Sequence, residues 1–257
     1  RDDHDMTSSY KEVEAYVSLL KGDLKGKKIG ILENVVKSIH VEETKALFTA
    51  LCESCKAQGA EIISISLNDD LMHAFLPTYY IIANAESTAN HSNLDGLRFG
   101  LAQEGNDIEE VMTNSRTFGF GPLLRKRFVI GSYALFIENQ EKIFRKAQKV
   151  RRLIVNDLNE AFTKVDVLIA PASAQGAPIM GDASLDQLSS EYLIAENFMA
   201  LANFAGTPSI TIPMGFVHGL PVGLNLNAKA FEDAKLLDIA YGFEKITGLH
   251  DQVKEPQ

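Results

Sequence analysis

The sequence predicts an α/β fold in which a mixed, largely parallel sheet is covered by helices. Three observations favour this class: the chain begins as strand, helix and strand, its middle is rich in helix-forming residues, and its last third returns to strands. A chain of 257 residues can bury about three quarters of the surface that it exposes when unfolded, so we expect a real core. We find no internal repeat and no linker-like change of composition, and we therefore expect residues 1–257 to form a single domain.

The first predicted unit is a strand, a helix and a second strand. Lys27 to Leu32 is a short apolar strand, and Glu61 to Leu67 is rich in β-branched residues. Gly59 ends the helix between them, in which apolar residues recur near one face at helical spacing: Val41, Leu47, Phe48, Leu51, Cys52 and Cys55. A unit of this length predicts two parallel strands with a right-handed crossover.

The middle of the chain, about residues 78 to 163, is predicted to be mainly helical. Gly119 to Pro122 forms a glycine-rich turn that leads into a basic segment flanked by apolar residues. Beyond it, Glu138 to Phe162 has the periodicity of one long amphipathic helix.

The last third is predicted to hold three strands and a closing helix. Val165 to Pro171 is a near-continuous apolar run, which is typical of a strand covered on both faces. The segments PSITIPMG and LPVGLNLNA follow as two strands joined by a turn around His218 and Gly219. Phe231 to Ile246 is predicted to be the closing helix.

Charge and hydropathy exclude some classes of function. The chain has 25 Lys and Arg against 34 Asp and Glu, a formal net charge of -9, and this field opposes direct binding to nucleic acid or anionic lipid. No apolar run reaches the roughly 18 residues that a membrane span needs. If nucleic acid takes part in the function, we expect another subunit to hold it.

Common chemical signatures are absent from the sequence. It has no GxGxxG, no Walker loop, no HExxH and no GxSxG. Cys52 and Cys55 form a lone CxxC, which could indicate a redox or zinc site, but there is no second Cys pair and the six His residues are scattered. We interpret both cysteines as small buried apolar residues of a helix and expect no metal site. These patterns alone give an α/β domain of unknown activity.

Four segments carry a resemblance to a known family. They are YYIIANAESTANHSNLDGLRFG from Tyr79, SRTFGFGPLLRKRFVIGSYAL from Ser115, VDVLIAPASAQGAP from Val165, and NFAGTPSITIPMGFVHGLPVGLNLNA from Asn203. In order and spacing they resemble the amidase signature family. Within it, the Asp-Gly-x-Arg-Phe-Gly and Gly-Phe-Gly segments are most similar to the glutaminase subunits of tRNA-dependent amidotransferases.

The resemblance implies that the catalytic part of the enzyme lies outside this chain. The family uses a glycine- and serine-rich signature with a serine nucleophile, a second serine in a cis peptide and a lysine base. Nothing here matches it, because Thr7-Ser8-Ser9 and Ser189-Ser190 lack the glycines that would shape such a loop. We therefore expect the carboxy-terminal part of an amidase domain, with no catalytic residue of its own and no activity alone.

Three positions are predicted from the resemblance to line a glutamine site. Alignment from LDGLRFG places the family's tyrosine at Tyr79, and the basic triplet before Phe128 places its arginine at Arg127. Counting back from Asn203-Phe204-Ala205-Gly206 places the acidic residue at Glu196. Arg127 would bind the α-carboxylate of glutamine through paired N–H bonds, Glu196 would accept from the α-ammonium, and Tyr79 would supply a hydroxyl and a ring wall.

This set can also be interpreted without a pocket. An Arg in a basic triplet is usually solvated, a Glu in a helix usually faces water, and a Tyr beside another Tyr is usually part of a core. The acidic residue of the family is usually Asp, and the added methylene of Glu196 moves the carboxylate by about 1 Å. Asn93 stands where the family usually has Arg, and we assign it no role.

The resemblance implies a cytoplasmic enzyme that works with other subunits. A serine attacks the side-chain amide of glutamine, and the ammonia passes to a partner subunit that uses ATP and Mg²⁺ to activate glutamate attached to tRNA(Gln). The partner would bind most of the tRNA, and this chain would bind no cofactor. Two alternatives remain open: a stand-alone amidase of the same family, and a non-catalytic α/β binding or scaffold domain. Without the other half of the domain, we expect an open sheet edge and an exposed apolar patch.

Overall fold

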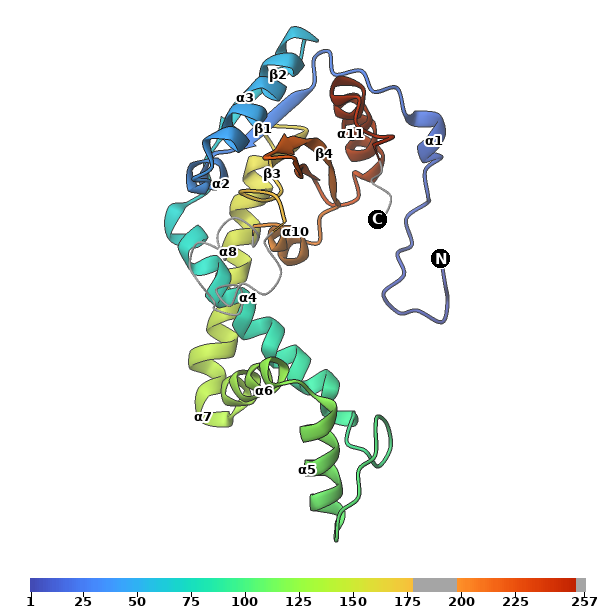
Figure 1. Ribbon diagram of the computed structural model, residues 1–257, viewed down its shortest axis with the longest axis vertical. Coiled ribbons are helices and arrows are strands. Elements are labelled where there is room, and N and C mark those ends of the chain that lie inside the picture. Colours follow the sequence, from blue (N-terminus) through green and yellow to red (C-terminus); the bar gives the residue numbers. More distant parts are fainter. Residues whose placement is uncertain (178–197, 253–257) are drawn as a thin grey trace. The chain divides into compact units, whose positions relative to one another are not determined.

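The computed structural model describes residues 1–177 and 198–252 (Figure 1). By its internal contacts the chain divides into two compact units. Unit 1 comprises Arg1–Ser66 and Asn159–Gln257, and unit 2 comprises Leu67–Leu158. The single domain expected from the sequence stays a prediction, because a compact unit defined by contacts is not a test of independent folding.

Unit 1 is built around a five-stranded sheet in the order β2-β1-β3-β5-β4. Its elements are α1 (Tyr16–Leu19), β1 (Lys28–Leu32), α2 (Glu33–Ser38), α3 (Glu42–Ala57), β2 (Glu61–Ile65), β3 (Val167–Pro171), α10 (Ala200–Ala205), β4 (Ser209–Val217), β5 (Leu220–Ala228) and α11 (Asp233–Thr247). Strand β1 pairs in parallel with β2 and β3, whereas β5 pairs antiparallel with β3 and β4. The predicted mixed α/β class is confirmed, and its parallel part is the β2-β1-β3 half of the sheet.

The main core lies on one face of this sheet. Helices α3 and α11 pack against that face and against each other. The side chains of Ile29, Ile169 and Leu226 come from neighbouring strands and meet Phe48 of α3 and Phe243 of α11. Leu226, Ile29 and Phe243 are fully buried, so this interface excludes water along the whole sheet.

The hairpin between β4 and β5 has the turn that the sequence predicts. Val217 pairs with Leu220, so His218 and Gly219 form a two-residue loop. Both have positive φ, 51° and 77°, the combination that a type I′ turn requires. β3 is buried along its whole length, which confirms the prediction for Val165 to Pro171.

Unit 2 is helical in its described elements. They are α4 (Asp69–Asn90), the 3₁₀ turn η1 (His91–Asn93), α5 (Ile108–Gly119), α6 (Pro122–Leu135), α7 (Ile137–Gln140), the π-helical turn η2 (Glu141–Arg145) and α8 (Lys146–Ala161), whose last residues belong to unit 1. None of the described helices is long and apolar enough to cross a membrane. The turn predicted at Gly119 to Pro122 is confirmed, since α5 ends and α6 begins there with Pro122 at its first position.

The long helix predicted over Glu138 to Phe162 is present in modified form. It is divided into α7, η2 and α8, and the wider π-helical turn sits at Glu141–Arg145. A π-helical turn keeps the chain helical but rotates the side chains that follow it. Ile154 and Leu158 are still buried on one side of α8, as the periodicity indicates.

Helices α4 and α6 make the main packing contact inside unit 2. The glycine at position 131 permits a close approach, because a Cβ there would overlap the carbonyl oxygen of Asn84 and the hydroxyl of Thr88. Thr88 Oγ1 donates to the carbonyl oxygen of Phe128 at 3.3 Å. Since Thr88 follows Asn84 while Phe128 precedes Gly131, the two helices run in opposite directions at this contact.

Candidate functional site

Two of the three predicted glutamine-binding residues lie on neighbouring helices of unit 2. Tyr79 is half-buried on α4, where its ring meets that of Tyr80 edge-on, with 6.0 Å between the centroids. Arg127 is exposed on α6. Glu196 lies outside the described residues. The three-residue site therefore stays a prediction.

The antiparallel packing of α4 and α6 sets the distance between these two positions. Arg127 directly precedes Phe128, whose carbonyl group meets Thr88. Tyr79 lies nine residues before Thr88, about 13 Å along the axis of α4 at a rise of about 1.5 Å per residue. Two long side chains separated in this way can bind only opposite ends of a small ligand placed between them. This is consistent with the different roles that we predict for Arg127 and Tyr79.

The LDGLRFG segment forms a tight turn that the sequence did not explain. Asp95 is buried, and its Oδ1 accepts from the backbone N–H groups of Leu97 and Arg98 at 2.9 and 3.0 Å. These bonds, that of Arg98 first, hold the pKa of Asp95 below its ordinary value of 3.8. Gly96 has a φ of 79°, and a Cβ there would overlap Ser115 Oγ. Both residues are therefore fixed by local geometry.

Arg116 ties this turn to α5. Its Nη1 donates to the carbonyl oxygens of His91 and Leu94, at 2.8 and 3.0 Å. Its guanidinium group lies over the rings of Phe120 and Phe128, 5.0 and 5.4 Å from their centroids. The family motif is thus anchored by one arginine that cannot lose its charge near neutral pH.

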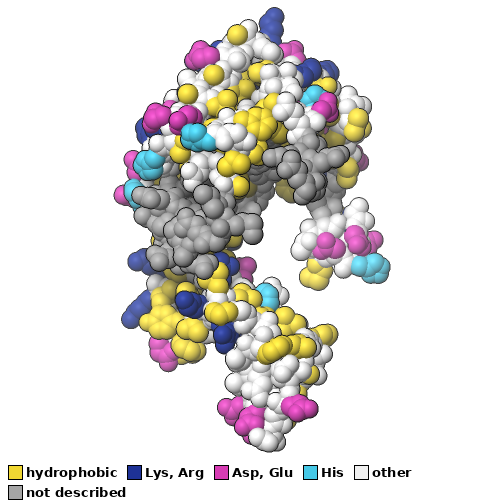
Figure 2. Space-filling view, in the orientation of Figure 1, with side chains coloured by type: hydrophobic (Ala, Val, Ile, Leu, Met, Phe, Trp, Pro, Cys, Tyr) yellow, Lys and Arg dark blue, Asp and Glu magenta, His cyan; other side chains and the backbone are white. Residues whose placement is uncertain are grey.

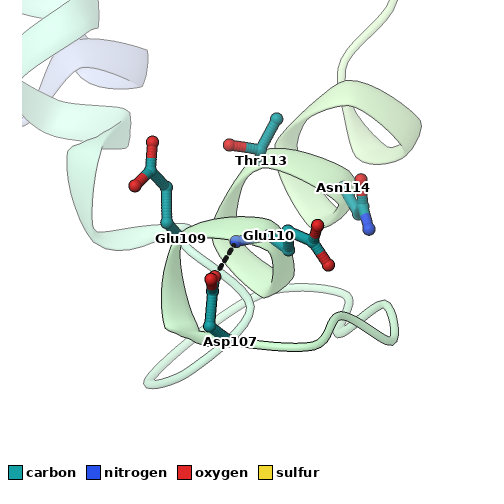
Figure 3. A pocket seen from close by; sticks show the side chains of 5 residues that line it. All are labelled: Asp107, Glu109, Glu110, Thr113 and Asn114. Atoms are coloured by element: carbon teal, nitrogen blue, oxygen red, sulfur yellow. Dashed lines mark hydrogen bonds between the residues drawn. The ribbon is translucent and has the colours of Figure 1, made fainter.

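An acidic hollow of about 500 Å³ lies at the first turns of α5 (Figure 3). It is lined by Asp107, Glu109, Glu110, Thr113 and Asn114, and it contains neither Tyr79 nor Arg127. Asp107 caps the helix by accepting from the N–H of Glu110 at 2.8 Å. Three exposed carboxylates would repel the carboxylate of glutamine, so we do not place the amino acid there.

The cysteines behave as the sequence predicts. Cys52 and Cys55 are free and buried in the core beneath α3. Burial raises the pKa of each thiol to about 12, so both stay protonated near neutral pH and are poor nucleophiles. Across residues 1–177 and 198–252, no three His, Cys, Asp or Glu side chains gather in a way that could hold a metal ion.

A polar ladder occupies the sheet face opposite the main core. Asn225 is buried, and its Nδ2 donates to Ser209 Oγ and Thr211 Oγ1 at 3.1 and 3.0 Å. Asn227 Nδ2 donates to Asn225 Oδ1 at 2.6 Å. The alternation in LPVGLNLNA indicated that these residues share a face, but only the register of β4 on β5 shows which partners they meet.

Comparison with known proteins agrees with the motifs. The family described as Amidase matches residues 1–237. This chain belongs to the amidase family. Its membership accounts for the placement of the LDGLRFG turn and the mixed sheet in one sequence.

Amidase-family relatives match nearly the whole chain. The A subunit of glutamyl-tRNA(Gln) amidotransferase from Caldanaerobacter subterraneus subsp. tengcongensis is 38% identical over 245 residues, which are 95% of this chain and 49% of the relative. The protein of the same name from Thermosynechococcus vestitus is 37% identical over 260 residues, covering 100% of this chain and 52% of the relative. The chain therefore spans about half the length of the curated relatives it matches.

A solved structure shares the fold. The crystal structure of the corresponding amidotransferase protein from Thermotoga maritima, which carries the same name, aligns with a TM-score of 0.72 and 28% identity, over 95% of this chain and 48% of that one. The peptide amidase from Stenotrophomonas maltophilia aligns with a TM-score of 0.68 at 23% identity, over 96% of this chain and 49% of that one, and this likeness shows the fold alone.

Proposed function

We propose that this chain is the glutamine-binding part of a glutaminase subunit in a tRNA-dependent amidotransferase that converts Glu-tRNA(Gln) to Gln-tRNA(Gln). The observation that carries the proposal is the identity of 38% over 95% of the chain to a relative named as the A subunit of glutamyl-tRNA(Gln) amidotransferase. The motifs that support the likeness, LDGLRFG and the segment from Ser115, are the same ones that build the α4 to α6 region.

Glutamine recognition requires groups of opposite charge, because the amino acid is a zwitterion at its α carbon. Arg127 binds the carboxylate, and its exposed guanidinium group is free to form two parallel N–H bonds. Glu196 accepts from the ammonium group, and Tyr79 covers the apolar part of the side chain. The serine that attacks the amide belongs to a glycine- and serine-rich segment that this sequence lacks, so the chain alone is inactive.

The rest of the reaction depends on other subunits. A partner subunit uses ATP and Mg²⁺ to activate the glutamate on tRNA(Gln), and it receives the ammonia. The net charge of -9 supports a protein that leaves tRNA binding to its partners. The assembly is a hetero-oligomer in the cytoplasm.

The test uses the full-length protein together with the other amidotransferase subunits of the same organism. Ammonia released from glutamine and Gln-tRNA(Gln) formed are measured with and without those subunits, tRNA, ATP and Mg²⁺. We expect ammonia release to rise in the complete mixture and Gln-tRNA(Gln) to form only there. Hydrolysis of other amides by the isolated protein, with no effect of the partners, would contradict the proposal in favour of a stand-alone amidase. Absence of glutamine binding would favour a scaffold.

A further inference from the structure

Helix α5 carries an apolar stripe that its own unit leaves largely uncovered. Ile108, Val111, Met112, Ser115 and Phe118 recur at helical spacing on one side. Of these only Ser115 is buried, while Ile108 is 66% and Phe118 72% exposed. Amphipathic helices normally bury this side against another element, and here most of it faces solvent.

The loop before α5 adds further apolar side chains to this surface. It covers Ser115, whose Oγ accepts from the N–H of Gln103 at 2.8 Å, and Asn114 Nδ2 donates to the carbonyl oxygen of Glu104 at 2.8 Å. We use the name α5 face for the exposed apolar residues of the loop and helix: Leu97, Phe99, Leu101, Ile108 and Phe118. Hydrophobic side chains are visible over this part of unit 2 in Figure 2, with Asp and Glu at its end.

The α5 face is held in a defined shape. Asp95 closes the turn that carries Leu97 and Phe99, and Arg116 fastens it to α5 through two backbone carbonyl groups. A surface that is already ordered loses little conformational entropy on binding. Such order favours a docking role over a loop that is exposed by chance.

Charge limits the kind of partner that fits. Asp107, Glu109 and Glu110 are exposed beside Ile108, and residues 101–115 contain no Lys or Arg. A domain core placed over this end would have to desolvate three carboxylates, which is costly without paired cations. An interface between subunits that has an apolar centre and a charged rim meets no such cost.

We infer that the α5 face is a docking surface for another subunit of the amidotransferase, one that presents apolar side chains flanked by Lys or Arg. This inference rests on the proposed function and names the place where its partner binds. Phe118 and Ile108 are its central contacts, and the three carboxylates set the orientation of the partner.

Binding of the other amidotransferase subunits of the same organism to the full-length protein tests this surface. Phe118→Glu and Ile108→Glu should each weaken the complex about 30-fold, as the loss of a central interface side chain does. Glu109→Lys combined with Glu110→Lys should weaken it more at low salt than at high salt. Phe216→Glu is the matched control, because Phe216 is 50% exposed on β4 in unit 1, and it should bind within about 2-fold of wild type.

Folding and identity of the partner are checked separately. Circular dichroism and Tm should be unchanged in all variants, because every substituted side chain is exposed. A photo-crosslinking residue at position 118 should label the partner subunit. Variants that bind as wild type, or crosslinks confined to the protein's own chain, would overturn the docking surface while leaving the proposed function intact. If the wild-type protein binds none of these subunits, the proposed function itself fails.

Discussion

Unit 1 buries its apolar residues, whereas unit 2 displays many of them. In unit 1, the sheet and helices α3 and α11 enclose a continuous core that includes Phe48 and Phe243. In the described part of unit 2, more large apolar side chains are exposed than apolar side chains of any size are buried. The contrast teaches that ordinary composition can serve two purposes: unit 1 uses apolar area for its own stability, and unit 2 keeps it for contacts made elsewhere.

The two units also hold their shape by different means. The sheet of unit 1 is stabilised mainly by a broad apolar interface, which scales with buried area. Unit 2 depends on local devices, namely the close approach of α4 and α6 at Gly131 and the polar anchors Asp95 and Arg116. Substitutions should therefore have effects that depend on the unit in which they fall.

The largest expected effect comes from the same substitution made in each unit. Phe243→Ala removes a fully buried ring from unit 1 and should cost about 3–5 kcal/mol of unfolding free energy. Phe118→Ala removes a ring that is 72% exposed in unit 2 and should change it by about 0.5 kcal/mol or less. Urea unfolding followed by circular dichroism measures both, and equal losses would remove the distinction between the units.

A smaller effect is expected at the α4 and α6 contact. Gly131→Ala forces a methyl group into the carbonyl of Asn84 and should destabilise unit 2 by about 1–3 kcal/mol. Gly119→Ala is the matched control, because nothing lies within 4 Å of its Cβ position. It should be neutral or stabilising by up to about 1 kcal/mol, since alanine is the better helix former. A Gly131→Ala variant as stable as wild type would mean that the helices do not pack this closely.

The smallest effect should depend on pH. The pKa of folded Asp95 lies below its ordinary value of 3.8, because the N–H groups of Arg98 and Leu97 favour the ionised form. Its stabilising contribution is thus complete above the unfolded pKa and is lost as pH falls through the folded pKa. Asp95→Asn should lower Tm at pH 7 and lower it less as pH falls below about 4. A Tm difference that stays constant with pH would show that the charge of Asp95 plays no part.

Local periodicity predicted the elements of the fold well. The predicted strand Lys27 to Leu32 and closing helix Phe231 to Ile246 agree with β1 and α11 to within two residues at each end. These succeed because the spacing of apolar residues is set by the element itself. The antiparallel pairing of β3 with β5 could not be predicted in this way, since it joins residues far apart in the chain.

The candidate site was less accessible to sequence reasoning. Alignment suggested Tyr79 and Arg127, but not the opposite directions of α4 and α6 that separate them. The anchoring role of Arg116 was missed because its partners, His91 and Leu94, lie more than twenty residues earlier and are backbone groups. Any residue can offer a carbonyl oxygen, so no pattern of residue types marks such a contact.

Glutamine recognition by Arg127 is the most direct test of the central claim. KM and kcat for glutamine are measured in the full-length amidotransferase with Arg127→Ala, and with Lys126→Ala as the control at an exposed neighbour. Loss of a charged bond of roughly 1.5–3 kcal/mol should raise KM about 10- to 100-fold in Arg127→Ala. The KM of Lys126→Ala should stay within about 2-fold of wild type. Equal KM values for the two variants and the wild type would contradict the account.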